Sequence, residues 1–310
     1  MTAGARYPFP PYPSGWYLLL ESGALAPGQV RPLRYFGRDL VLFRTEAGAP
    51  VLLDAHCPHM GAHLGYGGTV EGDGLRCPFH HWRFDGDGRC DDVPYLRDGA
   101  AVPDAGVACW RVHETSGLLL TSFGSPAWSM PDLPEWHDGC TYEQFGWTVR
   151  MHVQELAENI PDTTHFLYVH HVPVLPVAEV ETDGHLYHQR TIGRTDDGTI
   201  AWQTEQWAYG LGLVWLRAPG QVPFLTATTP IDDETVDLRL LFLVDDHLDD
   251  AGKAMIEAIA ATTADDVPIW EHKVYRDRPH LVPGDGPIGV LRKWARQFYD
   301  RPSEVSPRSR

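Results

Sequence analysis

The sequence has little positive charge, few cysteines and no long apolar run. It contains 25 lysine and arginine residues against 42 aspartate and glutamate residues, a formal net charge of −17. This acidity argues against nucleic acid or an acidic membrane surface as a partner, because both are bound through basic patches. No apolar run approaches the ~20 residues that span a bilayer, and the first sixteen residues lack an apolar signal core. We therefore expect a cytoplasmic protein with no membrane span.

The cysteines also exclude a disulfide framework. Two of the five, Cys57 and Cys77, lie in conspicuous motifs, which leaves Cys90, Cys109 and Cys140. An odd remainder in a reducing compartment predicts free thiols. The length of 310 residues allows two domains, each with its own core.

Two short segments contain a cysteine and a histidine each. Cys57 and His59 lie in C-P-H-M-G-A-H-L-G, and Cys77 and His80 lie in C-P-F-H-H-W-R-F. Two thiolates and two imidazoles suit a Rieske [2Fe–2S] cluster, in which two Cys hold one iron and two His hold the other. A structural zinc site is the alternative, but zinc motifs usually pair Cys with Cys and His with His. The mixed pairs favour the Rieske cluster.

The first part of the chain has the pattern of an antiparallel β domain. Short apolar stretches are broken by Gly, Asp and Pro, and the expected strands are Val30–Phe36, Leu40–Thr45, Val51–Ala55 and Leu118–Ser122. The Pro-rich segment S-P-A-W-S-M-P-D-L-P-E-W follows and is typical of a linker. We therefore divide the chain into domains 1–130 and 131–310.

The second part combines helices with a sheet. Val153, Leu156, Ala157 and Ile160 repeat as one face of a helix, which Pro161 then perturbs. Long aromatic stretches predict one curved antiparallel sheet, and further helical patterns follow. The expected strands are His185–Thr191, Thr199–Tyr209, Val214–Ala218, Phe224–Pro230 and Thr235–Val244, and the expected helices are Asp250–Thr263, D-D-V-P-I-W-E-H-K-V-Y and Val290–Phe298. This predicts an α+β domain with helices on one face of the sheet.

A second metal motif lies in N-I-P-D-T-T-H-F-L-Y-V-H-H. Asp162, His165 and His170 have the spacing D-x2-H-x4-H, and non-haem iron oxygenases bind Fe(II) with two His and one carboxylate. His171 competes with His170 for the second imidazole position. The carboxylate can come from far along the chain, and the candidates are Asp265, Asp266 and Glu271. An Asp shortly before Pro268 is also a typical helix N-cap.

These motifs together resemble the Rieske non-haem iron oxygenases. The phrases A-H-C-P-H-M-G-A-H-L-G-Y-G-G, D-G-D-G-R-C, I-W-E-H-K-V-Y and G-D-G-P-I-G-V-L-R-K-W-A-R-Q-F-Y are most similar to the oxygenase component of 3-ketosteroid 9α-hydroxylase. The resemblance implies an all-β Rieske domain followed by a helix-grip, START-like catalytic domain. It implies a [2Fe–2S] cluster on Cys57, His59, Cys77 and His80. His81 departs from the family, which usually has Gly at this position.

The resemblance also implies the residues of the second centre. It places mononuclear Fe(II) on His165, His170 and Asp266, with Asn159 and Asp162 in the catalytic machinery. In this family the residue at the position of Asp162 connects the iron centre to the Rieske histidine of a neighbouring subunit, which implies a homotrimer.

The implied activity is O2-dependent hydroxylation of a hydrophobic, steroid-like substrate. Electrons would come from NAD(P)H through a reductase, directly or by way of a ferredoxin. Only 96 positions separate His170 from Asp266, which is short for the steroid enzymes and leaves the exact substrate open. Six aromatic residues in the middle segment suit a flat apolar ligand, although strand alternation assigns half of them to the core. They are Trp202, Trp207, Tyr209, Trp215, Phe224 and Phe242.

Two other functions are compatible with the same motifs. The first is a Rieske oxygenase that tailors another natural product by desaturation, oxidative cyclisation or demethylation. The second is a Rieske electron carrier, which would need no second metal. The motifs do not determine the position attacked, the number of oxygen atoms inserted or the redox partner.

Overall fold

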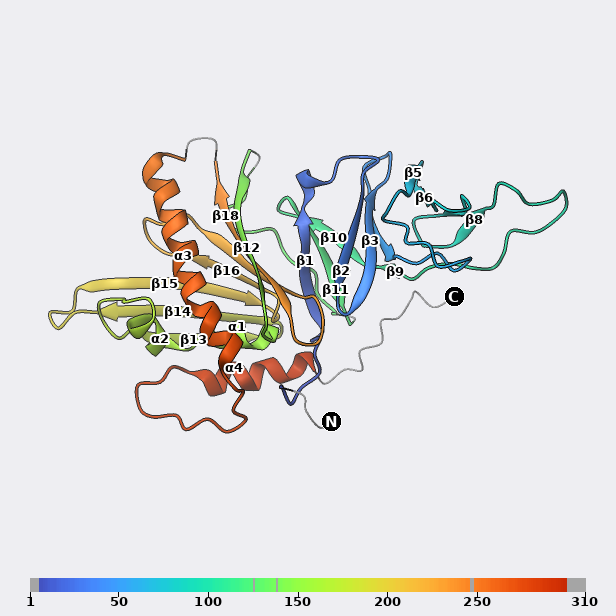
Figure 1. Cartoon of the computed structure of the whole chain (residues 1–310). Coiled ribbons are helices and arrows are strands. Elements are labelled where there is room, and N and C mark those ends of the chain that lie inside the picture. The colour runs from blue at the N-terminus through green and yellow to red at the C-terminus, as the bar shows by residue number, and fades with distance from the viewer. Residues whose placement is uncertain (1–5, 125, 138, 246–247, 300–310) are drawn as a thin grey trace. The chain divides into compact units, whose positions relative to one another are not determined.

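The structure is a computed structural model that describes residues 6–124, 126–137, 139–245 and 248–299 (Figure 1). It contains two compact units. One comprises Leu19–Ser122, and the other comprises, among the described residues, 6–18 together with 123–299. No helix among the described residues is both long and apolar enough to cross a membrane.

The Leu19–Ser122 unit is built from small sheets. The first sheet has the order β2 (Val30–Tyr35), β3 (Arg38–Arg44), β4 (Pro50–Asp54), β9 (Cys109–Trp110), and the second has the order β5 (Thr69–Glu71), β6 (Gly74–Arg76), β7 (Arg83–Phe84), β8 (Cys90–Asp92). A third sheet has the order β1 (Gly15–Glu21), β11 (Leu118–Phe123), β10 (Val112–Thr115), and its strand β1 begins before the unit boundary. Val41, Phe43, Leu53, Leu75 and Phe84 form the core of the unit. The loops after β4 and β6 carry the two Cys/His segments.

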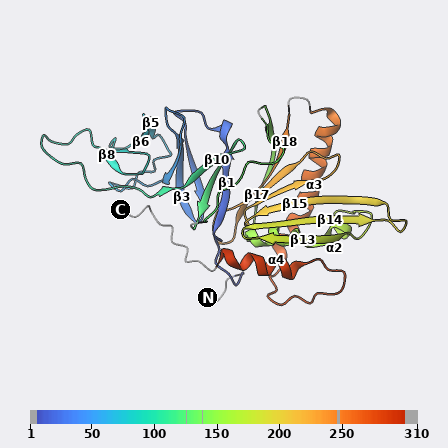
Figure 2. The same cartoon turned by 180° about the vertical axis from the view of Figure 1, so that it is seen from behind.

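The other unit contains one seven-stranded antiparallel sheet. Its order is β12 (Thr141–Val149), β18 (Val236–Val244), β17 (Phe224–Pro230), β16 (Leu213–Arg217), β15 (Ile200–Tyr209), β14 (Leu186–Arg194), β13 (Val177–Asp183). The helices are α1 (Val153–Asn159), α2 (Thr163–Tyr168), α3 (Asp250–His272) and α4 (Ile288–Ala295). Helix α3 crosses one face of the sheet, in front of the strands in Figure 1 and behind them in Figure 2. The predicted fold class is confirmed.

Apolar side chains attach α3 to this face. Ile256 and Ala260 of α3 pack against Phe224 of β17 and against Leu240 and Phe242 of β18. All five side chains are buried. Their burial stabilises the helix on the sheet, because transfer of an apolar side chain out of water is worth about 1.5–3 kcal/mol.

Helix α3 differs from the sequence prediction. Two successive helices were expected, with Asp265 or Asp266 at the start of the second, but α3 is continuous and contains Pro268. Its N-cap is Asp249, whose carboxylate accepts a hydrogen bond from Gly252 N at 2.8 Å. The capping interpretation of Asp265 and Asp266 is therefore wrong. Packing against the sheet offsets the backbone hydrogen bond that Pro268 cannot make.

The break at Pro161 is confirmed. Helix α1 ends at Asn159 and α2 begins at Thr163. Asp162 is the N-cap of α2 and accepts a hydrogen bond from His165 N at 3.2 Å. The first candidate iron ligand, His165, therefore lies in the first turn of a short helix that Asp162 starts.

Candidate metal centres

The two Cys/His loops share one backbone hydrogen-bond pattern. Cys57 N donates to the Ala62 carbonyl at 2.9 Å, and Gly61 N donates to the Cys57 carbonyl at 2.9 Å. In the second loop, Cys77 N donates to the Trp82 carbonyl at 2.9 Å, and His81 N donates to the Cys77 carbonyl at 3.1 Å. Each cysteine is thus held at the base of a closed turn.

The side chains of these loops form a donor set that fits a [2Fe–2S] cluster. Cys57 and Cys77 are buried, and the rings of His59 and His80 lie 4.6 Å apart between centroids. His59 Nδ1 is buried and has no hydrogen-bond partner. Burial beside the Cys77 sulfur raises the pKa of Cys57 to about 11, so this thiol ionises where a cation compensates its charge. Two buried thiols and an orphaned imidazole nitrogen suit iron ligation.

His81 has a strained backbone. Its φ is 61°, in the left-handed region that favours glycine, and Gly61 has a φ of 76° at the equivalent position of the first loop. The side chain of His81 is exposed, whereas that of His80 is half-buried. The turn therefore directs these consecutive histidines to different surroundings.

The second centre brings together three predicted residues. Ligand atoms of His165, His170 and Asp266 lie within 4.8 Å of one another, and they are the one such group of three found among the described residues. His170 Nε2 is 3.2 Å from Asp266 Oδ2. His171 is exposed with a φ of 55°, and Asp265 is exposed. The structure therefore leaves these alternatives outside the group, and Glu271 also lies outside it.

Local contacts orient the two imidazoles. His165 Nδ1 donates to the Asp162 backbone carbonyl, which leaves the lone pair of Nε2 available to a metal. Burial lowers the pKa of His165 and favours the neutral form that ligates. His170 Nδ1 is buried without a hydrogen-bond partner. Two imidazoles and one carboxylate suit a non-haem iron, so the residues fit the expected group.

Asn159, the last residue of α1, contacts two residues of α3. Its Nδ2 donates to Asp266 Oδ2 at 3.3 Å, and its Oδ1 accepts from Trp270 Nε1 at 3.2 Å. Asn159 therefore orients one carboxylate oxygen of Asp266, and Trp270 in turn holds the amide of Asn159. The sequence analysis proposed Asn159 for the machinery but did not anticipate the role of Trp270.

Two buried acidic residues of α1 form ion pairs with residues far along the chain. Glu158 binds Arg292 at 2.7 Å, and Glu155 pairs with Lys273. Burial raises the pKa of Glu155 although Lys273 opposes that shift. The sequence analysis missed this network, because single acidic residues on a helix are usually solvated.

A small cavity lies beside the three-residue group. Its volume is about 150 Å³, and it is lined by His165, His170 and Asp266 at the metal site and mostly by apolar side chains elsewhere. Of the six aromatic residues that the sequence suggested, Phe224 lines this cavity, while Trp215 and Phe242 are fully buried core residues.

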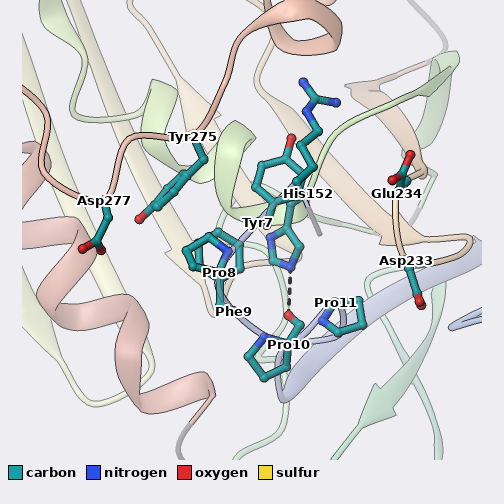
Figure 3. Close-up of a pocket in the computed structure, with 11 residues that line it drawn as sticks. Tyr7, Pro8, Phe9, Pro10, Pro11, His152, Asp233, Glu234, Tyr275 and Asp277 are labelled. Carbon is teal, nitrogen blue, oxygen red and sulfur yellow. Dashed lines mark hydrogen bonds between the residues drawn. The ribbon is translucent and has the colours of Figure 1, made fainter. Parts of the chain in front are cut away.

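A second, larger cavity lies elsewhere among the described residues (Figure 3). It has a volume of about 740 Å³, is lined by Tyr7, Phe9, His152 and Tyr275 among others, and shares no described residue with the smaller cavity. His152 uses both ring nitrogens, because Nε2 donates to the Pro10 carbonyl at 3.1 Å and Nδ1 accepts from Gln154 N at 3.1 Å. This histidine therefore has no nitrogen left for acid–base chemistry, and the larger cavity lacks a metal-ligating group like that of the smaller one.

Comparison with known proteins covers both units. A model of the 3-ketosteroid 9alpha-hydroxylase C-terminal domain matches residues 122–299, and a model of the Rieske [2Fe-2S] domain matches residues 15–111. A probable 3-ketosteroid-9-alpha-monooxygenase oxygenase component of Rhodococcus rhodochrous is 31% identical, over 96% of this chain and 82% of its own. Cholesterol 7-desaturase nvd 1 of Ciona intestinalis is 30% identical, over 96% of this chain and 70% of its own.

A solved structure shares the fold. Pseudomonas putida CBB5 NdmA with caffeine has a TM-score of 0.74, with 20% identity, over 91% of this chain and 89% of its own. At that identity the likeness concerns the fold alone.

Proposed function

The chain belongs to the Rieske oxygenases whose catalytic domain is of the 3-ketosteroid 9α-hydroxylase type, and from this premise we propose that it hydroxylates a steroid-like substrate with O2. The family makes it an oxidoreductase with a Rieske [2Fe–2S] cluster and a mononuclear iron. We assign domains 1–130 and 131–310 to these two cofactors. The observation that carries the proposal is the group of two imidazoles and one carboxylate at the wall of an apolar cavity.

The proposed site residues have distinct tasks. Cys57, His59, Cys77 and His80 would hold the cluster, and His165, His170 and Asp266 would hold the iron. When bound, the cluster carries single electrons and the iron activates O2. Asn159 would orient the carboxylate of Asp266, and the apolar walls would exclude water from the reacting C–H bond. One oxygen atom enters the product and the other leaves as water, with NAD(P)H as the source of two electrons.

Asp162 is the proposed link between the two centres. Its backbone carbonyl accepts from His165 Nδ1, and its side chain is 39% exposed, so a partner could reach it. We propose a homotrimer in which Asp162 faces the cluster histidine of a neighbouring subunit. A reductase supplies electrons in this family, and we propose that it acts directly or through a ferredoxin. The three cysteines outside the proposed cluster, Cys90, Cys109 and Cys140, form no disulfide, and we propose the cytoplasm as the compartment.

The test is turnover of iron-loaded protein with a generic reductase, NADH, O2 and a panel of 3-ketosteroids. Mass spectrometry should show a product that has gained one oxygen atom, with little peroxide. NADH consumption that yields peroxide with every steroid would contradict the steroid assignment. Desaturation is the second candidate, favoured by the cholesterol 7-desaturase relative, and its product would have lost two hydrogen atoms instead.

A further inference from the structure

The lining of the cavity beside the three-residue group includes one buried glutamine whose side chain has no hydrogen-bond partner among the described residues. Gln206 on β15 lines this cavity and is 4% exposed. Its side chain makes no hydrogen bond with any described residue. A buried polar side chain is normally hydrogen-bonded, and an exception at a cavity wall indicates a partner that is not part of the protein.

The other uncharged polar groups of the lining differ from Gln206. Thr262 and Thr263 both donate to the Ile259 carbonyl, at 2.8 and 3.3 Å, and Asn159 is used by Asp266 and Trp270. Thr226 has no side-chain hydrogen bond, but it is partly exposed. Gln206 is therefore the uncharged polar residue of this wall that is deeply buried and whose hydrogen-bonding capacity no described residue uses.

The remaining walls restrict the ligand's chemistry. Apart from the three-residue group, no charged side chain lines the cavity among the described residues, and the other walls include Leu156, Val214, Leu240 and Ile259. A charged ligand would lose its hydration without gaining a counter-ion. A neutral, largely hydrocarbon ligand with one carbonyl or hydroxyl group matches both the walls and the amide.

The size of the cavity restricts where the carbonyl or hydroxyl oxygen of the ligand lies. At about 150 Å³, the cavity is smaller than the ~300–1,000 Å³ of sites that enclose a drug-sized ligand. Only one end of a molecule as large as a steroid can be enclosed. A carbonyl that reaches Gln206 and a C–H bond that faces His165 and His170 must then belong to the same enclosed end.

We propose that Gln206 is a specificity residue, which binds a carbonyl or hydroxyl oxygen on the enclosed end of the substrate, near the carbon that reacts. This inference rests on the proposed oxygenase function and narrows its substrate class. Ketones and alcohols share the required chemistry, because the amide both donates and accepts.

The test uses Gln206→Leu and, as a matched control, Gln203→Leu. Gln203 lies three positions earlier on β15, so strand alternation directs it to the opposite face, and it does not line the cavity. Binding to the iron-loaded protein without O2 would be measured by calorimetry for three ligand pairs. Each pair contains a monoketone and its analogue with C=CH2 in place of C=O. The ketones are a 3-ketosteroid, a 17-ketosteroid and a bicyclic ketone of decalin size.

We expect at least one ketone to bind the unsubstituted protein more tightly than its methylene analogue. Gln206→Leu should weaken the binding of that ketone by roughly five- to ten-fold, which corresponds to the loss of one hydrogen bond. The affinity for the methylene analogue should be unchanged. Gln203→Leu should preserve the preference. Thermal unfolding of both variants checks that they are folded.

Three outcomes would overturn the proposal: a ketone preference that survives in Gln206→Leu, an equal loss for both members of a pair, or no binding of any ligand. Failure of the proposed function is distinguishable. A Gln206-dependent preference for the bicyclic ketone alone, with no steroid bound or oxidised, would discard the steroid assignment and retain this inference. Steroid turnover without any ketone preference would retain the steroid assignment and discard this inference.

Discussion

The proposed cluster ligands lie between Cys57 and His80, in two loops with the same backbone hydrogen bonds, whereas 96 positions separate His170 from Asp266. The loops position their side chains through local turns. The second centre depends on the packing of α3 across the sheet and on the contact between Asn159 and Trp270. A local centre can be recognised from one sequence motif, whereas a centre made by tertiary packing takes one ligand, Asp266, from outside its motif.

The two centres also share a pair of consecutive histidines. In both, a candidate ligand is followed by a second histidine, as His80 is by His81 and His170 by His171. In both, the second histidine has a positive φ and is exposed. A left-handed residue reverses the chain, so the two neighbouring rings separate and only the first histidine of each pair is directed to its site.

The largest effect is expected when one of the two metal centres is removed and the other is kept. His165→Ala should lose the mononuclear iron and all oxygenation, leaving two irons per chain and an intact cluster absorption spectrum. Metal analysis and visible spectroscopy measure both properties. His171→Ala, a change at an exposed neighbour, should keep three irons. Full turnover by His165→Ala would show that the assignment of His165 is wrong.

The distant ligand offers a second test. Asp266→Asn should abolish tight iron binding at the second centre, while Asp265→Asn, on the exposed side of α3, should leave it unchanged. Asn159→Ala should weaken iron affinity by about 10- to 100-fold, because it removes the partner that orients Asp266. Competition with a chelator measures all three. Equal behaviour of the two Asp variants would contradict the choice of Asp266.

The contribution of the α1 N-cap to the free energy of unfolding should depend on pH. Burial lowers the pKa of His152 to about 4, from an ordinary 6.5, and His152 is the N-cap of α1. The unfolded state then binds the proton more readily, so the free energy of unfolding should fall by roughly 3 kcal/mol as pH decreases from 6.5 to 4.

The variant His152→Gln can make the same two hydrogen bonds without titrating. Urea unfolding of both proteins at pH 7 and at pH 4.5 isolates the contribution of His152, since the remaining groups titrate in both. An identical pH dependence for the two proteins would contradict the prediction.

The smallest effect concerns the strained cluster loop. His81→Gly should stabilise the unit by about 0.5–1 kcal/mol, because it relieves a left-handed backbone that glycine adopts freely. Gly61→Ala, at the equivalent position of the sister loop, should destabilise by a similar amount. Denaturant unfolding measures both, and opposite signs are the expected result.

Much of the fold was predictable from periodicity. The inner strands β14 to β18 and the helix break at Pro161 appear as predicted, because apolar repeats report directly on burial. The sheet edges β12 and β13 were missed. Their exposed, mixed side chains lack an apolar repeat. The partner of β12 is the distant strand β18, whereas β13 pairs with the next strand, β14. The single helix α3 was read as two, since packing on the sheet outweighs the local effect of Pro268.

The sequence by itself determined the family, the two cofactors and the candidate donors within each motif, because ligand type and spacing follow from metal chemistry. Their ligand roles stay predictions until metal analysis. Residue patterns left Asp265, Asp266 and Glu271 open as the third ligand, and the resemblance favoured Asp266, which the tertiary structure places beside His165 and His170. The tertiary structure alone decided which indole holds Asn159 and that Gln206 faces the cavity without a partner. These features depend on which faces of α3 and β15 are buried, and burial arises from contacts between segments that no local pattern records.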